Sequence, residues 1–548
     1  METCKNCPTQ FEVSDEDKAF YKKMDVPQPT LCPLCRQQRR AAFRNERQLY
    51  KRKCDLSGND IVTNYSSDKP YKVYGYDQWW GDGWDPLEYG RDFDFDRPFF
   101  EQFDELLHDV PRLFLYNPFS ENSQYTNHSY HNKNCYLTFD SAYNEDTLYS
   151  TNLIVKLKDS MDCMTAEEGE FLYWNIYTKK NYNCKFVVHC SGCMDSDFLY
   201  DCKGCSSCFM CHGLRNKQYY INNTKYSQSE YEEKMKEYNL GSYKKLEKLK
   251  GDFMKMVKGD AIHKNLHIDN SENCMGDYIF NSKNVRWSFY ADNCEDIAYC
   301  FDALGNKDCM DTYESSIDCE LQYDCYACNE SSMMRFCVLC HFSHGLEYCD
   351  YCFHCKDCFG CTGLKKKQYC IFNKQYTKEE YEELRGRIVA KMKESGEYGE
   401  FFPVAISPFG YNETMAQEFS PLAKEVALEK GYKWQDKDKK SYLPANYNLA
   451  DDVKDESEDV MGAVLACGSC GKNYKFMPKE WALYKRWGLA VPRQCFDCRH
   501  EDRVLGFRNV RALWNKSCGK CGKDFLTSYG GDEVKKLYCE ECYLKEVY

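Results

Sequence analysis

The chain has 548 residues, of which 43% are hydrophobic and 16% aromatic, and its formal net charge is -13. A chain of this length can hold roughly three to five domains, each with its own core. The acidic balance excludes a protein coated with nucleic acid over its whole surface, because phosphate binding needs local cationic charge. We find no secretory leader and no run of about 18 apolar residues, so we expect a cytoplasmic protein without a membrane segment.

Two Cys-x2-Cys pairs stand near each end of the chain, and the spacing between the pairs is the same at both ends. Superposing Cys4 on Cys467 also aligns Tyr21 with Tyr484 and Arg36 with Arg499. Four thiolates in this pattern bind a tetrahedral Zn²⁺ and leave no open position for substrate, so we expect two structural zinc ribbons. Iron is the alternative ion, since four sulfurs suit both metals. The expected ligands are Cys4, Cys7, Cys32 and Cys35 in one ribbon and Cys467, Cys470, Cys495 and Cys498 in the other.

A basic strip follows the first ribbon, with eight Arg or Lys against one Glu over residues 36–53. Such local charge in an acidic protein indicates contact with RNA or DNA phosphates. Two alternatives stay open: a solvated helix beside the metal site, or a strip that docks on the acidic middle of the same chain. The residues assigned to nucleic acid are Arg39, Arg40, Arg44, Arg47 and Arg52.

A second small unit follows each ribbon, since residues from 43 onward resemble those from 507 onward. The carboxyl-terminal copy has a full ligand set, Cys518, Cys521, Cys539 and Cys542. The amino-terminal copy has Cys54, Ser57, Gly75 and Gln78 at the matching positions, and one thiol of four cannot hold zinc. We therefore expect three structural zinc ions. Residues 73–107 are dense in aromatic side chains, and we expect them to cover the first coil of a β-solenoid rather than to stack on sugars or bases.

The middle of the chain is an internal duplication, in which residues 131–233 align with residues 281–383 without a gap. Many cysteines within each copy recur at one constant spacing, as do Cys163, Cys184 and Cys205. That spacing of about 21 residues is typical of a parallel β-helix. We therefore expect a mainly β fold with a duplicated parallel β-helix of about 21 residues per coil, flanking helices and zinc-ribbon modules at both termini.

Most central cysteines are expected to pack inside the solenoid, because free cysteine behaves as a small apolar side chain. The internal repeat supports this, since Cys337 and Cys349 align with Val187 and Leu199. At four positions of the repeat, three residues apart, both copies carry cysteine, and for these eight residues core packing, metal binding and redox work stay open. They are Cys202, Cys205, Cys208 and Cys211 and their partners Cys352, Cys355, Cys358 and Cys361.

Helices are predicted at 227–238, 242–257 and 377–396, the last beginning with a capping box of Thr377 and Glu380. The expected organisation is a zinc ribbon with basic linker (1–53), a degenerate knuckle and aromatic cap (54–116), solenoid copy A (117–226), a helical insertion (227–262), solenoid copy B (263–376), a helix (377–400), an extended segment with acidic linker (401–460), a zinc ribbon (461–516) and a zinc knuckle (517–548).

The ribbon pattern around Cys4, Cys7, Tyr21, Pro29, Cys32, Cys35 and Arg36, repeated from Cys467, resembles the probable zinc-ribbon domain of many bacterial proteins. As a whole, the chain resembles an uncharacterised cysteine-rich protein family of candidate-phyla bacteria. The shared stretches include WWGDGWDPLEYGRDFDFDRPFFEQF and SPFGYNETMAQEFSPLAKE. Some members of that family carry an acyl-CoA transferase label, which no motif of this sequence supports. The resemblance implies zinc binding and a bacterial origin but no reaction.

The sequence favours a non-enzymatic zinc-binding scaffold with a protein or RNA/DNA partner, no catalytic residues and no identified small-molecule substrate. One alternative is a carbohydrate-active β-helix enzyme that uses paired carboxylates. The acidic residues available for that role are Glu167, Glu168, Glu170, Asp311, Glu314 and Glu320. The other alternative is metal storage or redox sensing through the shared cysteines, which would require more than three metal ions per chain.

Overall fold

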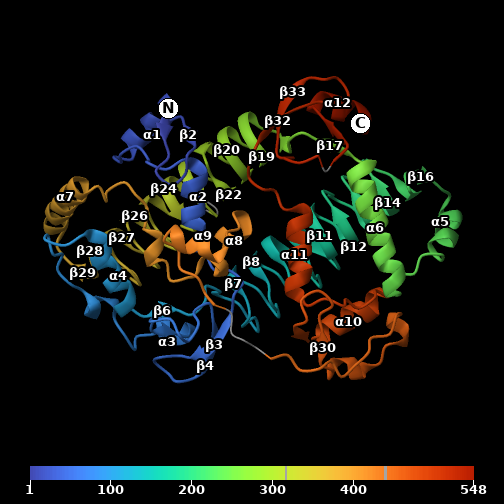
Figure 1. Cartoon of the computed structure of the whole chain (residues 1–548), viewed down its shortest axis with the longest axis horizontal. Coiled ribbons are helices and arrows are strands. Elements are labelled where there is room, and N and C mark those ends of the chain that lie inside the picture. The colour runs from blue at the N-terminus through green and yellow to red at the C-terminus, as the bar shows by residue number, and fades with distance from the viewer. Residues whose placement is uncertain (315–317, 437–440, 533) are drawn as a thin grey trace. The chain divides into compact units, whose positions relative to one another are not determined.

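A computed structural model describes residues 1–314, 318–436, 441–532 and 534–548 (Figure 1). The chain divides into two compact units. Unit 1 consists of Met1–Leu115 and Leu266–Asp436, and unit 2 consists of Tyr116–Asn265 and the described residues from 441 onward. Each unit therefore combines one terminal cysteine-rich segment with one copy of the internal repeat, but in crossed order: the amino-terminal segment belongs with the second copy and the carboxyl-terminal segment with the first.

Both copies of the repeat fold into long sheets of parallel strands that follow one another in chain order. We call the sheet of unit 2 stack A and that of unit 1 stack B. The strands of stack A are β7 (Asn127–Tyr130), β8 (Phe139–Ala142), β9 (Thr151–Lys158), β10 (Met164–Glu170), β11 (Tyr173–Lys179), β12 (Tyr182–Val188), β13 (Met194–Tyr200), β14 (Ser206–His212), β15 (Gln218–Ile221) and β16 (Thr224–Lys225).

Stack B has the same sequential order, except that β22 pairs with both β20 and β23. Its strands are β18 (Ile268–Asp269), β19 (Glu272–Phe280), β20 (Lys283–Asp292), β21 (Glu295–Ala298), β22 (Phe301–Leu304), β23 (Lys307–Tyr313), β24 (Glu320–Tyr326), β25 (Ser332–Arg335), β26 (His344–Glu347), β27 (Lys356–Phe359), β28 (Gln368–Ile371) and β29 (Lys374–Gln375). The fold is mainly β, as predicted, with two duplicated stacks.

Neighbouring strands are twelve residues apart along the chain for most of both stacks. Tyr182 pairs with Met194, and His344 pairs with Lys356. Parallel bridges outside the named strands keep the same step, as between Ser191 and Lys203. The coil length predicted from the cysteine spacing is therefore wrong. Its error has a simple source: inward positions recur every three residues, so cysteines align at any multiple of three, and the sequence alone did not single out twelve.

The three-residue period comes from the backbone. In the stretch 348–361, Tyr348, Tyr351, His354 and Asp357 all have φ between 46° and 55°. Each of these left-handed residues directly precedes a fully or almost fully buried cysteine. A left-handed residue turns the chain, so each turn brings the next side chain to the interior. Cysteines at every third position are thus successive inward positions.

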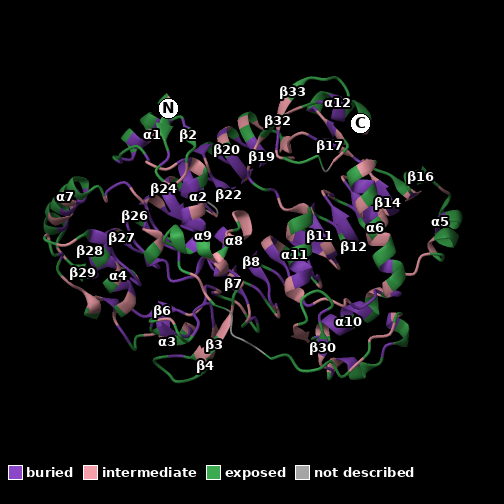
Figure 2. Ribbon diagram, viewed as in Figure 1, coloured by how far each residue is buried: buried purple, intermediate pink, exposed green. Residues whose placement is uncertain are grey.

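The inward thiols donate hydrogen bonds to backbone carbonyls. The Cys349 Sγ lies 3.3 Å from the carbonyl of Glu347 and 3.6 Å from that of Cys358. Serine makes the same pair of bonds where it replaces cysteine, as at Ser331 with Asn329 and Cys340. Figure 2 shows the strands of both stacks mostly buried and α5 (Gln228–Met235) and α7 (Lys378–Ser395) largely exposed. The prediction that the central thiols fill a core fits this arrangement.

Helices flank each stack at the predicted places. In unit 2 these are α5 (Gln228–Met235) and α6 (Tyr243–Gly259), and in unit 1 α7 (Lys378–Ser395). Capping boxes begin α5 and α7, the latter through Thr377 and Glu380 as predicted. Before each of these two helices a short antiparallel pair, β15–β16 or β28–β29, ends the stack. The further helices of unit 1 are α1 (Asp15–Lys23), α2 (Pro33–Ala41), α3 (Tyr76–Trp80), α4 (Phe99–Asp109), α8 (Met415–Phe419) and α9 (Lys424–Glu429).

The aromatic segment lies in unit 1 and covers the last turns of stack B. The ring of Phe99 is 5.3 Å from that of Phe372, and the ring of Trp79 is 5.6 Å from that of Phe353. The Arg91 N–H donates to the Phe372 carbonyl at 3.1 Å. The segment therefore covers one end of a stack, but the last turns of copy B rather than the predicted first coil.

Small hairpins and helices make up the rest. Unit 1 has β1 (Glu2–Thr3), β2 (Gln10–Phe11), β3 (Tyr50–Lys53), β4 (Asp60–Thr63), β5 (Val73–Tyr74) and β6 (Arg112–Leu113). Unit 2 has β17 (Ile262–Lys264), β30 (Leu465–Ala466), β31 (Asn473–Tyr474), α10 (Pro478–Trp487), α11 (Phe496–Phe507), β32 (Trp514–Ser517), β33 (Asp524–Thr527), β34 (Lys536–Tyr538) and α12 (Glu540–Val547). Part of the predicted acidic linker, residues 437–440, lies outside the described residues. No helix in the described part of the chain is long and apolar enough to cross a bilayer.

We expect the interior of the stacks to accept a hydroxyl but not a ring. Cys340→Ser replaces a thiol donor by a hydroxyl, which at Ser331 already donates to backbone carbonyls in the same way. The substitution should therefore change the free energy of unfolding by no more than about 1 kcal/mol. Cys340→Phe overpacks the same position and should cost about 1 to 3 kcal/mol or more. Urea unfolding of both variants measures the difference. Loss of bound metal in Cys340→Ser would contradict a purely packing role for this thiol.

Candidate metal centres and their docking on the stacks

Three groups of four cysteines bring their Sγ atoms within 4.8 Å of one another. They are the three groups predicted from the sequence: Cys4, Cys7, Cys32 and Cys35; Cys467, Cys470, Cys495 and Cys498; and Cys518, Cys521, Cys539 and Cys542. In each group the first pair lies between or beside the strands of a hairpin and the second pair at the start of a helix. We call the modules that hold the first two groups ribbons and the module that holds the third a knuckle.

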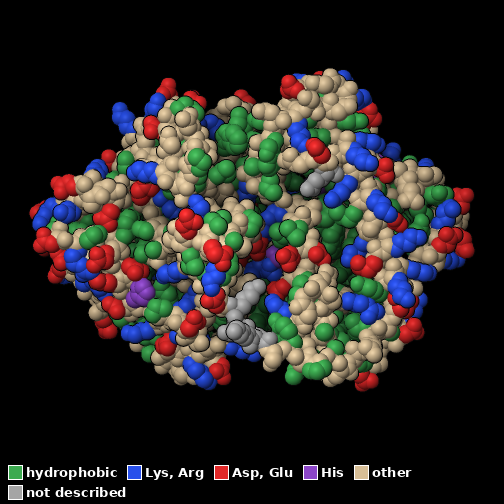
Figure 3. Space-filling view, in the orientation of Figure 1, with side chains coloured by type: hydrophobic (Ala, Val, Ile, Leu, Met, Phe, Trp, Pro, Cys, Tyr) green, Lys and Arg blue, Asp and Glu red, His purple; other side chains and the backbone are tan. Residues whose placement is uncertain are grey.

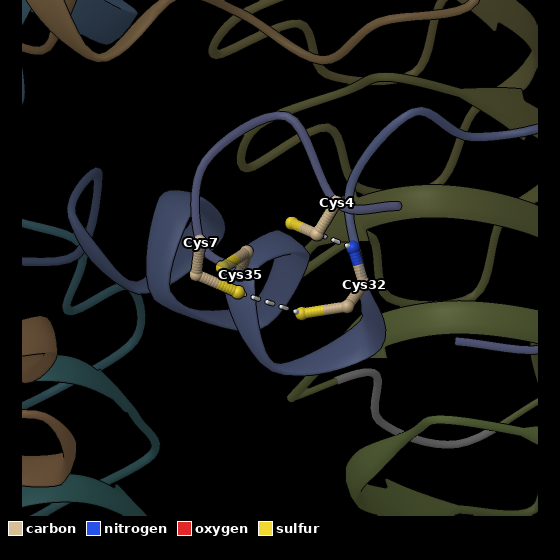
Figure 4. Close-up of side chains that lie close together, drawn as sticks. All are labelled: Cys4, Cys7, Cys32 and Cys35. Carbon is tan, nitrogen blue, oxygen red and sulfur yellow. Dashed lines mark hydrogen bonds between the residues drawn. The ribbon is translucent and has the colours of Figure 1, made fainter. Parts of the chain in front are cut away.

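The amino-terminal group shows how the fold gathers the thiols. Cys4 and Cys7 lie on the turn between β1 and β2, Cys32 is the N-cap of α2, and Cys35 lies in its first turn. The Cys32 N–H donates to the Cys4 Sγ at 3.2 Å, and the Sγ atoms of Cys7 and Cys32 are 3.8 Å apart. Figure 4 shows the four side chains pointing toward one another.

The two carboxyl-terminal groups repeat this geometry. Cys495 and Cys539 are the N-caps of α11 and α12. The Sγ of Cys470 is 3.7 Å from that of Cys495, and the Sγ of Cys521 is 3.7 Å from that of Cys539. A sulfur of the knuckle also accepts a backbone N–H, in the 3.4 Å bond from Cys539 to Cys518. The turn and the helix start are thus common to all three groups.

The sulfur spacing fits a tetrahedral thiolate site. A metal–sulfur bond of about 2.3 Å gives a tetrahedron with edges of about 3.8 Å. The observed separations are 3.7 to 3.8 Å. The electrostatics also favour thiolate at one position of each ribbon: the hydrogen bond from Cys35 lowers the pKa of Cys32 to about 5. Burial opposes ionisation of Cys467, but backbone N–H groups of Cys470 and Cys495 bring its pKa to about 6.

The degenerate knuckle keeps the turn without the ligand set. The Cys54 Sγ accepts the backbone N–H groups of Ser57 at 3.5 Å and of Gly75 at 3.4 Å. Gly58 has φ of 73°, matching Gly522 at 75° in the complete knuckle. The Gln78 Oε1 lies 2.8 Å from where a Cβ on Gly75 would stand, so its amide occupies the place of the missing thiols. In the degenerate knuckle, backbone N–H groups that donate to the single Cys54 sulfur hold the turn. The complete knuckle has four cysteine sulfurs at the matching positions.

The basic strip of unit 1 docks on stack B. The Arg36 Nε lies 2.8 Å from an Asp311 oxygen, and Arg40 bridges Asp311 at 3.3 Å and Asp324 at 2.6 Å. Arg39 contacts Asp324 at 2.7 Å and Glu400 at 2.8 Å. The side chains of Arg40, Asp311 and Asp324 are all 0% exposed. The helix that begins with two cysteines of the candidate metal site therefore places the arginines that follow them against the acidic side of stack B.

Unit 2 contains the same docking arrangement. Arg499 and Arg503 correspond to Arg36 and Arg40 in the alignment that superposes Cys467 on Cys4. They contact the two oxygens of Asp162 in stack A at 3.1 and 2.8 Å. A tyrosine of the stack completes each contact: Tyr149 donates to Glu480 of α10 at 2.8 Å, and Tyr299, its counterpart in the second copy, donates to Asp17 of α1 at 3.2 Å. Each ribbon thus contacts its own stack through an equivalent pair of arginines and one tyrosine, and the amino-terminal ribbon adds Arg39.

The remaining arginines of the strip also have partners in unit 1. Arg44 pairs with Glu46 and Glu314, Arg47 lies 3.7 Å from Glu418, and Arg52 lies 2.9 Å from Asp55. The structure thus matches the alternative that the sequence left open, a strip that docks on the acidic middle of the chain. Nucleic-acid binding by Arg39, Arg40, Arg44, Arg47 and Arg52 stays a prediction.

The central thiols are not gathered as the terminal ones are. Within the residues that the structure describes, no three of their sulfurs meet the 4.8 Å criterion that the terminal groups satisfy. The carboxylates considered for glycoside cleavage are largely paired: Glu167 with Lys179 at 2.8 Å, Glu168 with Lys180 at 3.6 Å, and Asp311 with the ribbon arginines. The role of Asp162, Asp311 and Asp324 as docking partners was not predicted from the sequence. The signal in the sequence was that the ribbons, with their arginines, and the central repeat are both duplicated.

Comparison with known proteins gives no family. No family model matches the chain, and no curated protein sequence matches it. Among solved structures, the crystal structure of a presumed acetyltransferase from Desulfovibrio desulfuricans G20 has a TM-score of 0.11 and 9% sequence identity. The match covers 48% of this chain and 68% of that chain. A TM-score of this size carries no argument about fold or activity.

Breaking the docking pair should destabilise unit 2 strongly. Arg503→Met removes one of the two guanidinium groups at the buried Asp162, and an incompletely paired buried charge costs about 3 kcal/mol or more. Asp162→Asn added to Arg503→Met should recover part of that loss. Urea unfolding measures both, with Lys545→Met, at an exposed ion pair of α12, as the control that should leave the midpoint unchanged. Equal midpoints for Arg503→Met and the control would show that the pair is not a docking element.

Proposed function

We propose that this protein is a non-enzymatic scaffold stabilised by three zinc ions. The observation that carries the proposal is the spacing of the three cysteine groups, whose sulfur separations of 3.7 to 3.8 Å suit a tetrahedral ion held by four thiolates. Four protein ligands close the coordination shell, so such an ion has no position for water or substrate. Zinc is preferred to iron because the sites sit in small turn-and-helix modules of the kind that structural zinc holds.

The proposal extends to the fold of the stacks. We interpret each stack as a parallel β-helix whose coil has twelve residues and four three-residue sides. The support is the twelve-residue step of the ladders and the left-handed residue at every third position. Solenoids of this kind present long side faces to partners, and each coil contacts only its neighbours. The metal modules then serve as lateral supports, fixed to the solenoids by the buried arginines.

In this proposal the basic strip is a docking element. Its arginines follow the metal ligands on the same helix, so the metal and the ion pairs fix one another's position. Metal loss would free the start of α2 or α11, and the guanidinium groups would lose the alignment that pairs them with Asp311 or Asp162. The arginines thus hold the modules of each unit together, which is the role expected of charges in a scaffold.

Metal analysis tests the proposal. Protein purified without chelators should contain three zinc ions per chain by elemental mass spectrometry. Cys518→Ser should lower the count to two, because it breaks one of the three complete groups. Cys54→Ser is the matched control and should leave the count at three, since Cys54 belongs to no such group.

Two results would contradict the proposal. A count clearly above three would place metal among the central thiols and favour metal storage. Stoichiometric iron with visible absorbance would replace the structural zinc assignment by an iron–sulfur one.

A further inference from the structure

The outer face of α6 in unit 2 carries a row of lysines. The helix buries Leu246, Phe253, Met256 and Val257, and the ring of Phe253 lies 5.7 Å from that of Phe198 in stack A. At about 100° per residue, Lys248, Lys255 and Lys258 fall within an arc of about 80° on the opposite side. All three are exposed. They extend over about 15 Å of helix, at about 1.5 Å per residue.

A distant segment of unit 2 prolongs this row. The Lys535 N–H donates to the Lys258 carbonyl at 3.0 Å, and the Lys536 Nζ donates to the Asp260 carbonyl at 3.0 Å. The parallel pairing of β17 with β34 fixes this junction. We name Lys248, Lys255, Lys258, Lys535 and Lys536 the lysine stripe. Two parts of the chain that lie far apart in the sequence thus contribute to one surface.

Few carboxylates compensate the lysine stripe. Asp252 lies 3.3 Å from Lys255, both of them exposed to a large degree, and Glu247 pairs with Lys250 on the flank of the helix. Asp260 stands at the end of α6, and Asp451 accepts the Lys244 N–H at its start. Within the described residues no carboxylate is in ion-pair distance of Lys248, Lys258 or Lys535. In Figure 3, Lys and Arg side chains gather over the place that α6 occupies in Figure 1.

The stripe differs from the amino-terminal strip in what its charges face. Arg40 of the strip is paired with a buried carboxylate, whereas four lysines of the stripe are exposed: Lys248, Lys255, Lys258 and Lys535. A strand of nucleic acid carries one phosphate about every 3.4 Å along a duplex axis, so about 15 Å of lysines can meet several phosphates. Gly251 lies between the lysines with nothing within 4 Å of a Cβ placed on it, so the helix backbone is open to close approach there.

We propose that the lysine stripe binds the phosphate backbone of nucleic acid. The contact is expected to be independent of sequence, because the lysine ammonium groups on one exposed helix face meet phosphates, which every sequence shares. The acidic charge of the rest of the chain keeps the polymer on this one surface. The proposal does not depend on the metal, so its failure leaves the scaffold proposal standing.

Fluorescence anisotropy with the full-length, metal-loaded protein tests the proposal. The probes are a labelled 20-nucleotide RNA, the DNA strand of the same sequence and its duplex, at 50 to 200 mM salt. We expect binding that weakens as salt rises. The triple variant Lys248→Glu, Lys255→Glu and Lys258→Glu should lose at least about tenfold in affinity at 50 mM salt, and its log–log salt slope on single strands should be smaller by about 2.

The matched control carries the same charge change on unit 1, outside the basic strip: Lys22→Glu, Lys356→Glu and Lys378→Glu, all at exposed positions. It should bind as the unmodified protein does, and both triples should keep the unfolding midpoint and metal count. The proposal is overturned if no nucleic acid binds at 50 mM salt, or if the two triple variants lose affinity equally. It is also overturned if a different polyanion binds as tightly as RNA or DNA does. The polyanions to be compared are polyglutamate and phosphatidylcholine vesicles that contain one phosphatidylserine in five lipids. Preference for RNA or for DNA would identify the natural polymer.

Discussion

The three-residue spacing of the inward positions in each stack is the constraint on which the rest of the molecule depends. A left-handed residue before each inward position costs energy for a side chain other than glycine, roughly 1 to 2 kcal/mol. That cost is offset by the ladder, in which the same residue donates its N–H to the preceding turn, as Tyr351 does to Val338 at 2.8 Å. A short side leaves room for one small inward group. Cysteine is small, apolar and able to donate to the carbonyls that line the interior, so it is suited to the position.

The second constraint is the outside of the stack, where the same backbone exposes other side chains. Asp162, Asp311 and Asp324 all occupy left-handed positions, with φ between 47° and 57°. They face outward and meet the arginines of the ribbons. Because those arginines follow directly on the second cysteine pair of each ribbon, the candidate metal site and the docking site occupy successive turns of one helix. Removing one partner of a buried ion pair is costly even where the intact pair adds little net stability. The contact therefore fixes the position of each ribbon on its stack.

Much of this could be read from the sequence, and the failures have physical causes. The three cysteine groups follow from pairs of cysteines separated by two residues, a spacing that lets one turn bring both thiols to a metal. The number of complete four-cysteine groups rests on the same logic, because Ser57, Gly75 and Gln78 cannot replace thiolates. The predicted repeat of 21 residues was wrong because the inward period is three, and a sequence that repeats every three residues does not show which multiple of three separates paired strands. Only the pairing of Tyr182 with Met194 and its equivalents reveals twelve. The function of the strip at 36–53 was ambiguous for a different reason, because charge density along a sequence does not tell which charges face solvent. In the structure, carboxylates of stack B that are distant in the sequence bury Arg36, Arg39 and Arg40.

The crossed order of the units sets a problem of timing during synthesis. Arg40 and its partner Asp311 are 271 residues apart in the chain. At about 5 to 20 residues per second, a ribosome needs roughly 15 to 55 s to make the intervening chain, which includes the whole of stack A. Throughout this interval the first ribbon is complete while its arginines have no carboxylate of stack B to meet. The carboxyl-terminal ribbon has no such delay, because its stack is already made when Arg499 and Arg503 emerge. The two units are alike in structure but differ in their risk of misfolding during synthesis. The risk is greater for the amino-terminal ribbon, because its arginines wait longest for their partners.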